Sequence, residues 1–511
     1  MSEVSQDASP MTDGSAAAAA ESCSQPVDPG PGSSSAGSSS AGGAVPQRAS
    51  EPVSPSREFL IAVGPATAAA FAVRAAVAIG LMWTVPLGSD ALDYFREAQA
   101  VASGSREAAP FYWPPGMTFL LAFLFDLLGS TVIVTRVALV LLGTLQTLFV
   151  ARLTMQLTGK PQAAKLAAWL WAIYPPAVLL TSQPYSQHLA GFCLIGAAVF
   201  GLQLLRHYRL RDALLTGGLI GVGCLSRPSM MSLALLLPVA APVAVWWQAG
   251  FRLKQLTLKQ LGKSAGMVCV SLAMVGAVLA PVLWHNARTG GGAALSTNNE
   301  RNLFLGNNPY TPLYKTSQLA QRPFESAPPE VQQYLLQFYN HPDPRTAMKQ
   351  EAIRHVLSHP GTSLLRTFNR TCAFWGFDYL SSRVLHTLGA VSLKGSILVL
   401  LLEAGGYALT MLLVLAGLCG MWRECSPAPL AWLVLVVLAY AGPYSLAFSG
   451  GTYHFPVIPV LLPLAGLALS AGWPRLRALL ISSRAVQLAV VLFTLVQLEY
   501  AWFAVQHFGD A

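Results

Sequence analysis

Residues 131–153 read TVIVTRVALVLLGTLQTLFVARL, an apolar run whose only charged residues are Arg136 and Arg152. A helix needs about 20 mainly apolar residues to cross the hydrocarbon core of a bilayer. Similar runs recur along the 511-residue chain, which is 53% hydrophobic and only 11% charged. Soluble proteins carry about 25% charged residues. The sequence therefore predicts an all-α polytopic membrane protein.

The apolar runs predict about eleven transmembrane helices, within a range of about 10–13. A shorter apolar piece ends near Leu128. The run 213–225 is short and breaks at SRP (226–228), so it is either a full span or half of a broken pair. Arg74 lies midway along the first run, where a charge is costly, so we expect it to face the bundle and find a partner. The predicted spans are 59–83, 131–153, 163–181, 188–205, 213–225, 229–247, 265–284, 396–421, 430–448, 455–471 and 485–505.

The runs divide the chain into four parts. Residues 1–57 are rich in Ser, Ala, Gly and Pro, which predicts a disordered cytoplasmic tail. Residues 58–284 hold the first transmembrane helices and a first extracytoplasmic loop, 84–112. Residues 285–394 mix Pro, Asn, Gln and aromatic residues with helix-like stretches, which predicts a small mixed extracytoplasmic loop domain. Residues 395–511 hold the remaining transmembrane helices.

Basic residues gather in four loops between the apolar runs. With alternate crossings, all four loops fall on the side of the N-terminal tail, and the positive-inside rule makes that side cytoplasmic. We therefore expect a plasma (inner) membrane protein with the loop 84–112 and the segment 285–394 outside. The net charge of +9 reflects these clusters, so we expect membrane lipids and no nucleic acid as partners. The clusters are Arg152, Lys160 and Lys165; Arg206, Arg209 and Arg211; Arg252, Lys254, Lys259 and Lys263; and Arg475, Arg477 and Arg484.

The seven cysteines show no CxxC pair and no spacing typical of metal ligands. Most lie in apolar runs, where cysteine behaves as a small hydrophobic residue. The sequence predicts neither a disulfide framework nor a metal cluster.

Two acidic residues, Asp90 and Asp93, follow the first apolar run in GSDALDYFREAQ (88–99). A spacing of three places both carboxylates on one face of a helix. A carboxylate close to the bilayer surface can accept a proton from a hydroxyl that attacks an anomeric carbon. The alternative is that Ser89 or Asp90 caps the helix, and composition does not separate the two roles.

Four stretches carry a family resemblance. The motif SDALDYFREAQAVASG (89–104) leads into WPPGMTFLLAFL (113–124), and it is followed by GCLSRPS (223–229), STNNERNLFLGNNP (296–309) and YHFPVIPVLLPLAG (453–466). Together they resemble the GT-C glycosyltransferases, closest to the family-39-like group of protein O-mannosyltransferases and the lipid A aminoarabinose transferase. The resemblance covers roughly residues 59–473, with all four motifs on one membrane face.

The resemblance implies an activity. Such an enzyme takes a hexose or pentose from a polyprenyl-phosphate lipid and transfers it, with inversion, to a hydroxyl or amine of a glycan, lipid or protein outside the membrane. Asp90 matches the first acidic position of the family, which implies the general base. Asp93 is the second catalytic candidate.

The donor phosphate leaves without needing a proton, but it requires positive charge, and arginine binds two phosphate oxygens at once. We favour Arg227 and Arg301 for this role, with Arg136 as a further candidate. His454 stands where the family often has an arginine, and Tyr94 follows the acidic motif as the family tyrosine does, so both join the candidate substrate-binding residues. The alternatives are membrane-interface packing for Arg136, a surface charge for Arg301 and a structural role for His454.

Gln187 stands where the family frequently has a second acidic residue. Glutamine can act neither as a base nor as a strong metal ligand, so no cofactor is predicted and a divalent metal is disfavoured. Three other functions remain open at this stage: a surface-polysaccharide polymerase or ligase, a lipid or solute transporter, and a non-enzymatic membrane scaffold. Paired ionisable groups at mid-membrane and internal repeats would favour a transporter, and the sequence shows no repeat.

Overall fold

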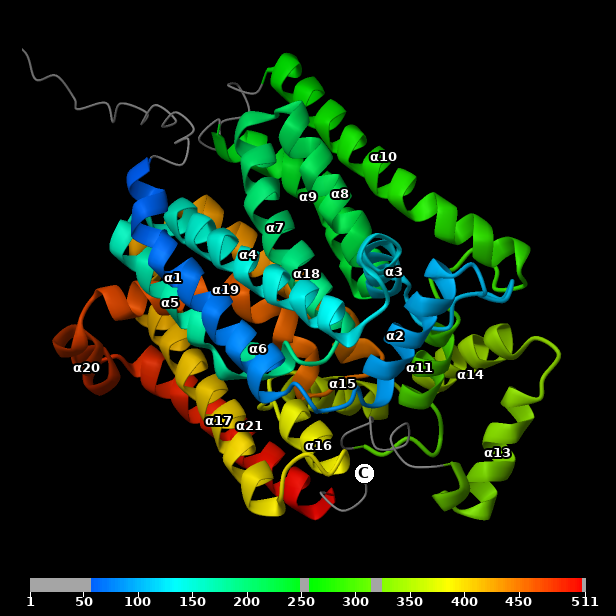
Figure 1. Ribbon diagram of the computed structural model, residues 1–511. Helices are drawn as coiled ribbons and strands as arrows, with labels where there is room; N and C mark the ends of the chain where they lie inside the picture. The colour runs from blue at the N-terminus through cyan, green and yellow to red at the C-terminus, as the bar shows by residue number, and fades with distance from the viewer. Residues whose placement is uncertain (1–56, 249–256, 314–323, 508–511) are drawn as a thin grey trace, which may run out of the picture. The chain divides into compact units, whose positions relative to one another are not determined.

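The computed structural model describes residues 57–248, 257–313 and 324–507, and every regular element in these residues is a helix (Figure 1). The predicted disordered tail, residues 1–57, lies outside the described residues apart from Arg57. The predicted all-α class is confirmed for the described part of the chain.

Nine of the described helices are long and apolar enough to cross a membrane. Two predicted spans fall short of that length. The first is divided into α5 (Pro161–Ile173) and α6 (Pro175–Leu180), because a residue before proline disfavours the helical conformation. The second is α8 (Leu210–Ser226), with 17 residues. The nine spans are formed by α1 (Arg57–Ala75) with η1 (Ala76–Leu81), α4 (Val132–Thr158), α7 (Ser186–His207), η2 (Pro228–Met230) with α9 (Met231–Gln248), α10 (Leu258–Arg288), α17 (Leu393–Leu415) with η5 (Ala416–Gly420), α18 (Pro427–Leu446), η7 (Gly451–Val457) with α19 (Ile458–Ser470), and α21 (Arg484–His507).

The helices α7 and α19 form the centre of the bundle. Each buries 83% of its apolar window, whereas the other spans bury 11–44% of theirs. α7 packs against α4 and α8, and α19 packs against α5 and α17. Gly466 permits the contact of α19 with α5, since a Cβ at this position would lie 2.4 Å from the carbonyl oxygen of Ala163. Close approach through small residues is typical of helices packed in membranes.

Ion pairs join loops at one end of the helices. Glu424, in η6 (Trp422–Glu424), accepts a hydrogen bond from Lys160 at 2.5 Å and also pairs with Arg475 of α20 (Trp473–Ser482). These residues follow α4, α17 and α19, so the three loops lie on one side, as the predicted alternation of spans requires. In the third basic cluster, Arg252 and Lys254 lie outside the described residues.

The loops at the other helix ends are also joined. The first loop contains α2 (Ser89–Ala102) and leads to the short apolar helix α3 (Gly116–Leu128). The Gln183 side chain accepts from the Gly88 N–H at 3.2 Å and donates to the Pro86 carbonyl at 3.0 Å. The Asn286 side chain accepts from the Phe111 N–H at 2.9 Å. The beginning of the first loop is therefore fixed to the loop between α6 and α7, and its end to the last turn of α10.

Arg74, in the last turn of α1, is fully buried between helices. Its guanidinium donates to the carbonyl oxygens of Trp171 at 2.8 Å and Ala172 at 2.9 Å. Gly143 leaves the space that it occupies, because a Cβ there would lie 2.5 Å from its Nε. The expectation that Arg74 faces the bundle and finds a partner is confirmed.

The segment 285–394 has a hydrophobic core of its own, formed where α11, α13 and α14 meet. The six core residues are Phe304, Leu305, Val331, Leu335, Met348 and Ala352. The segment is ordered and helical in its described residues, which exclude 314–323. Its helices are α11 (Asn298–Gly306), η4 (Phe324–Ser326), α13 (Pro329–Tyr339), α14 (Pro344–Ser358), α15 (Pro360–Phe374) and α16 (Leu380–Thr387).

Candidate active site

Asp90 and Asp93 lie near the start of α2, directly after the Gly88 that Gln183 binds. A carboxylate in the first turn of a helix interacts favourably with the free N–H groups there. Asp90 is half-buried, whereas Asp93 is exposed. Of the two predicted catalytic carboxylates, Asp90 therefore packs closer to the body of the protein.

Tyr94 lies one helical turn after Asp90 and is buried. Burial raises the pKa of the Tyr94 hydroxyl; Arg227 opposes that rise, and Asp90 and Glu97 add to it. The charges of these three residues therefore surround one hydroxyl. Tyr94 thus brings together the acidic motif of the first loop and the Arg-Pro break, which are far apart in the sequence.

Arg227 follows the last residue of α8 in extended backbone conformation (φ −144°), and Pro228 after it begins a new turn. Its side chain is half-buried, and its guanidinium carbon lies 5.4 Å from the centroid of the Tyr453 ring. The Nε atom is buried and has no hydrogen-bond partner within the described ranges. No described residue forms a hydrogen bond or an ion pair with this guanidinium. Its N–H donors remain available to a ligand.

Four tyrosines surround Arg227: Tyr94, Tyr440, Tyr444 and Tyr453. The rings of Tyr444 and Tyr453 are stacked with centroids 5.0 Å apart, and the Tyr440 and Tyr444 hydroxyls are 3.2 Å apart. Aromatic faces attract a cation without occupying its N–H donors. Arg227 and these four tyrosines are called the arginine–tyrosine cluster below.

A second arginine, Arg383 of α16, lies near Tyr185, as Asp90 does. Burial raises the pKa of Tyr185; Asp90 adds to that rise and Arg383 opposes it, so both charges lie near the Tyr185 hydroxyl. Arg383 is half-buried, and its guanidinium has no hydrogen bond or ion pair with a described residue. Leu388, just after α16, lies so close to Gly88 that a Cβ there would meet it at 3.1 Å. α16 is therefore packed against the start of the helix that carries Asp90.

Arg136 is buried at the beginning of α4, and each of its three guanidinium nitrogens donates to the main chain. Its guanidinium donates to the carbonyl oxygens of Trp83 at 3.1 Å, Val85 at 2.6 Å and Ser182 at 3.2 Å. These contacts fasten the chain just before α2. Arg136 thus positions the first loop, which is the structural alternative to phosphate binding.

His454 is completely buried in η7. Its Nδ1 lies 2.9 Å from the Phe374 carbonyl, its Nε2 lies 3.7 Å from the Asp378 carboxylate, and its ring stacks on Tyr407 at 4.3 Å. This placement corresponds to the structural alternative. The adjacent Tyr453, in contrast, belongs to the arginine–tyrosine cluster.

Arg301 lies on α11 and is half-buried against α13, with its guanidinium carbon 5.8 Å from the Tyr339 ring centroid. The neighbouring asparagines are structural. Asn307 accepts from Arg370, and the Asn308 side chain donates to the Phe304 carbonyl at 2.8 Å. The structure therefore places Arg301 on the segment 285–394, and no described contact joins it to the arginine–tyrosine cluster.

Gln187 is buried at the start of α7, and its Oε1 has no hydrogen-bond partner in the described part of the chain. Within residues 57–248, 257–313 and 324–507, no three His, Cys, Asp or Glu side chains group closely enough to hold a metal ion. The described residues that could meet a ligand thus include Arg227 with its tyrosines, Arg383 and Asp90.

Sequence reasoning did not single out Tyr185, Arg383, Tyr440 or Tyr444. A signal existed for Tyr440 and Tyr444, because a spacing of four places two hydroxyl-bearing rings on one face of an otherwise apolar helix. Arg383 has no such signal, since only the packing of α16 against the first loop brings it near Asp90.

Residues 113–280, about a third of the chain, match the family model described as dolichyl-phosphate-mannose-protein mannosyltransferase. No curated protein sequence matches the chain. The match includes the Pro-Pro-Gly step and Arg227, and it supports the predicted resemblance. Over these residues the chain is similar to a family of glycosyltransferases, and its apolar helices are those of a multi-pass membrane protein.

Three solved structures are similar in fold. Two are of the oligosaccharyltransferase AglB from Archaeoglobus fulgidus, one in complex with an inhibitory peptide and a dolichol-phosphate, the other tethered with an acceptor peptide. Both are 14% identical, with TM-scores of 0.45 and 0.46, and cover 88% and 86% of this chain. The third is the S. cerevisiae protein O-mannosyltransferase Pmt1-Pmt2 complex bound to the sugar donor, with 15% identity, a TM-score of 0.37 and 47% coverage. This chain spans only 55%, 53% and 35% of the respective structures.

Proposed function

We propose that this protein is a membrane glycosyltransferase that moves a sugar from a polyprenyl-phosphate donor to a hydroxyl or amine on the extracytoplasmic side. The observation that carries the proposal is Arg227, a half-buried arginine whose guanidinium has no hydrogen-bond or ion-pair partner among the described residues. It faces Tyr94, which Asp90 also faces. A phosphate-binding cation and a carboxylate base thus lie around one side chain.

The proposed reaction requires one base and one cation. The acceptor oxygen or nitrogen attacks the anomeric carbon, the bond from that carbon to the phosphate oxygen breaks, and the acceptor proton passes to Asp90. Polyprenyl phosphate leaves as an anion and needs no proton. Arg227 can hold two of its oxygens, because a guanidinium donates in a fork that matches a phosphate. A single displacement of this kind inverts the anomeric configuration.

Several residues outside the reacting groups support their placement. Arg136 and Gln183 hold the chain immediately before α2 and so fix the position of Asp90. The tyrosines of the arginine–tyrosine cluster hold Arg227 without consuming its donors. Arg383 supplies a second positive charge near Asp90.

The proposed side of the membrane follows from the loops. The acidic loop and the segment 285–394 lie opposite the loops that carry Lys160 and Arg475, and the positive-inside rule places those basic loops in the cytoplasm. A cysteine at exposed Ser105 should react with an impermeant maleimide added outside intact cells, whereas one at exposed Arg477 should react only after lysis. The reverse pattern would refute this orientation.

The test of the activity uses the full-length protein in lipid nanodiscs with a panel of polyprenyl-phosphate sugars and radiolabelled sugar release. Donor consumption with one member of the panel is expected, and NMR of the product should show the inverted anomer. If no member of the panel binds or is consumed, while solute flux occurs in liposomes, the protein is a transporter. If only preassembled glycan chains are transferred, it is a polymerase or ligase.

A further inference from the structure

The helix α15 has an unusual distribution of side chains for a helix outside the membrane spans. Its arginines point inward: Arg366 and Arg370 are buried and donate to main-chain carbonyls between Gly306 and Thr311. Its large apolar residues point outward, since Leu364 is 73% and Phe368 64% exposed. The exposed residues of α15 include no charged side chain. A helix that faces water has the opposite arrangement.

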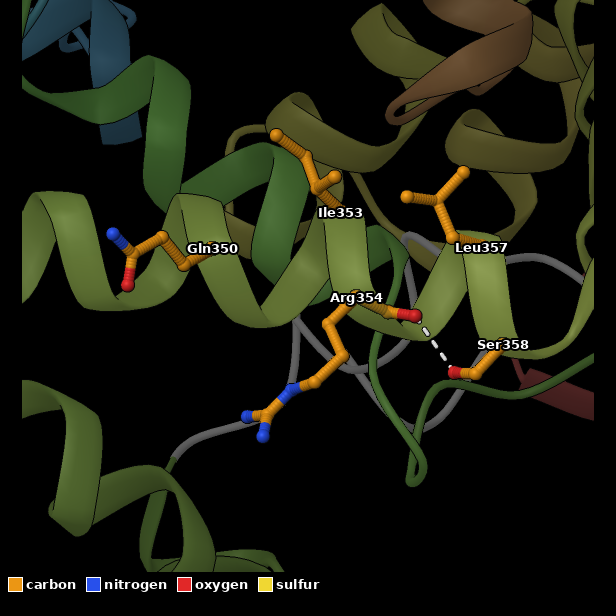
Figure 2. Close-up of a pocket in the computed structure, with 5 residues that line it drawn as sticks. All are labelled: Gln350, Ile353, Arg354, Leu357 and Ser358. Carbon is orange, nitrogen blue, oxygen red and sulfur yellow. Dashed lines mark hydrogen bonds between the residues drawn. The ribbon is translucent and has the colours of Figure 1, made fainter.

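The preceding helix, α14, continues this apolar surface. Figure 2 shows Ile353 and Leu357 on the same side of the helix, and these side chains are 43% and 74% exposed. They line an open surface pocket together with Gln350, Arg354 and Ser358. The polar members flank the two apolar side chains along one helix.

Five exposed apolar residues therefore lie on two consecutive helices. An exposed apolar surface of this kind marks a contact with a partner or a membrane. We name it the hairpin face, and it consists of Ile353, Leu357, Leu364, Leu365 and Phe368.

The hairpin face is continuous with a membrane-spanning helix. On α15, Thr371 lies one turn beyond Phe368, and its hydroxyl is 3.0 Å from that of Ser445 in the last turn of α18. Arg370 donates to the carbonyl of Leu446, the final residue of α18, at 2.6 Å. The Leu446 side chain is itself 63% exposed. The last turn of α15 thus lies where the exposed apolar surface of α18 ends, which identifies the bilayer as the occupant of the hairpin face.

We propose that the hairpin face inserts into the lipid–water interface of the bilayer on the side of the candidate active site. The five apolar side chains lie among the lipid chains just below the headgroups. Lys349 and Arg354, which are exposed on α14, extend along this surface and keep their charges at the headgroups. Bilayer contact then fixes α15, whose buried arginines hold the end of α11.

The experiment places single nitroxide spin labels on the full-length protein in nanodiscs. The labels are at Leu357→Cys, Leu364→Cys and Phe368→Cys, in a background with Cys23 and Cys269 changed to serine. Leu438→Cys, exposed on α18, is the lipid-facing control, and Gln333→Cys, exposed on α13, is the water-facing control. Power-saturation EPR then compares collisions with oxygen, which concentrates in lipid, and with a water-soluble nickel chelate.

At all three hairpin positions we expect the ratio of oxygen to nickel collisions to exceed that of Gln333→Cys at least fivefold, and brominated lipids to quench a fluorophore placed at the same cysteines. A ratio equal to that of Gln333→Cys would show that the face lies in water and overturn the proposal. Labels shielded from both reagents would show that a protein surface, such as a second copy of this chain, covers the face, and this too would overturn it. These outcomes do not depend on glycosyl transfer.

Discussion

Arg136 and Arg227 lie on the same side of the helical bundle, but their surroundings differ completely. The guanidinium of Arg136, at the start of α4, donates hydrogen bonds to three carbonyl oxygens of the main chain. The guanidinium of Arg227, at the end of α8, lies among tyrosine side chains and forms no hydrogen bond or ion pair with the residues that the structure describes. Every guanidinium nitrogen of Arg136 has a protein acceptor, whereas the guanidinium of Arg227 has none among the described residues.

The difference teaches how to separate structural from ligand-binding arginines in such a bundle. Burying a charged group is costly unless its hydrogen bonds are made. The terminal nitrogens of Arg74 and Arg370 and all three guanidinium nitrogens of Arg136 donate to carbonyl oxygens, although the Nε atoms of Arg74 and Arg370 have no partner among the described residues. Arg227 meets only part of it, through cation–π contact. A bound phosphate would accept hydrogen bonds from the remaining donors. Whether a guanidinium already has protein acceptors therefore indicates its role better than its burial or a sequence motif does.

The largest effect is expected from substituting Asp90, the proposed general base for the transfer in which Arg227 binds the donor phosphate. Asp90→Asn keeps the size and the helix-start preference of the side chain but cannot accept the proton. We expect kcat for transfer to fall about 10²- to 10⁴-fold, with donor affinity unchanged within a factor of about three. Glu107→Gln, at an exposed position beyond α2, is the matched control and should retain full activity. Full activity in Asp90→Asn would remove Asp90 as the base.

Arg227→Gln tests whether the guanidinium that lacks protein acceptors binds the donor phosphate. Loss of a preorganised donor to a developing negative charge costs about 10²- to 10³-fold in rate. We expect that loss together with weaker binding of polyprenyl phosphate, and Arg227→Lys should recover only part of it because an ammonium cannot bind two oxygens at once. The thermal midpoint should stay within a few degrees of wild type, as the side chain makes no hydrogen bond with a described residue. Unchanged donor affinity would contradict the assignment.

Arg136→Gln should show the converse behaviour. Removing the guanidinium leaves buried carbonyl oxygens without donors, and each unsatisfied group costs about 1–3 kcal/mol. We expect a loss of about 2–3 kcal/mol in the free energy of unfolding, measured by denaturant titration in detergent. The protein that remains folded should keep the donor affinity of wild type. Arg209→Gln, exposed at the opposite helix ends, is the control for loss of charge. If Arg136→Gln were stable but unable to bind donor, the two arginines would have the same role.

The sequence predicted the helices well because bilayer insertion imposes a strict length and composition. The run 131–153 became α4 (Val132–Thr158), and the run 455–471 became η7 and α19. It favoured Arg227 over Arg136 for phosphate binding but could not show what either guanidinium contacts, because both are lone arginines at the ends of apolar runs. The distinction depends on carbonyls of Trp83, Val85 and Ser182, which only the folded chain brings to Arg136.

The same limit applies to the other candidates. His454 matched a family position, but the structure buries it against Phe374 and Asp378. Arg383 carried no motif, yet the packing of α16 brings it near Asp90. Helix positions follow from local hydropathy, whereas the partners of a charged side chain depend on contacts between distant segments.

Asp90 and Asp378 can be compared in the same way, and the expected effect of substituting Asp378, a change in stability with pH, is smaller. Asp378 is the buried counterpart of Asp90: it lies between α15 and α16, faces Glu403, His454 and Tyr407, and has one oxygen without a hydrogen-bond partner among the described residues. Burial and the neighbouring Glu403 raise the pKa of Asp378 well above its usual value, so the folded protein favours the neutral acid. A raised pKa stabilises the fold below the unfolded pKa, and this contribution is lost as the pH rises through the folded pKa.

Asp378→Asn replaces the neutral acid with a neutral amide. The variant should therefore not lose stability at this position as the pH rises. We expect the variant and wild type to unfold at similar temperatures near pH 4, and the variant to become the more stable by about 1 kcal/mol or more for each unit of pKa shift as the pH rises. Asp343→Asn is the control of opposite sign: hydrogen bonds from Thr346 lower the pKa of exposed Asp343, so its contribution is present at neutral pH and lost on acidification. A stability difference between Asp378→Asn and wild type that does not change with pH would mean that Asp378 is ionised in the folded protein. The buried carboxyl would then need a cationic partner, and His454, 3.7 Å away, is the nearest described candidate.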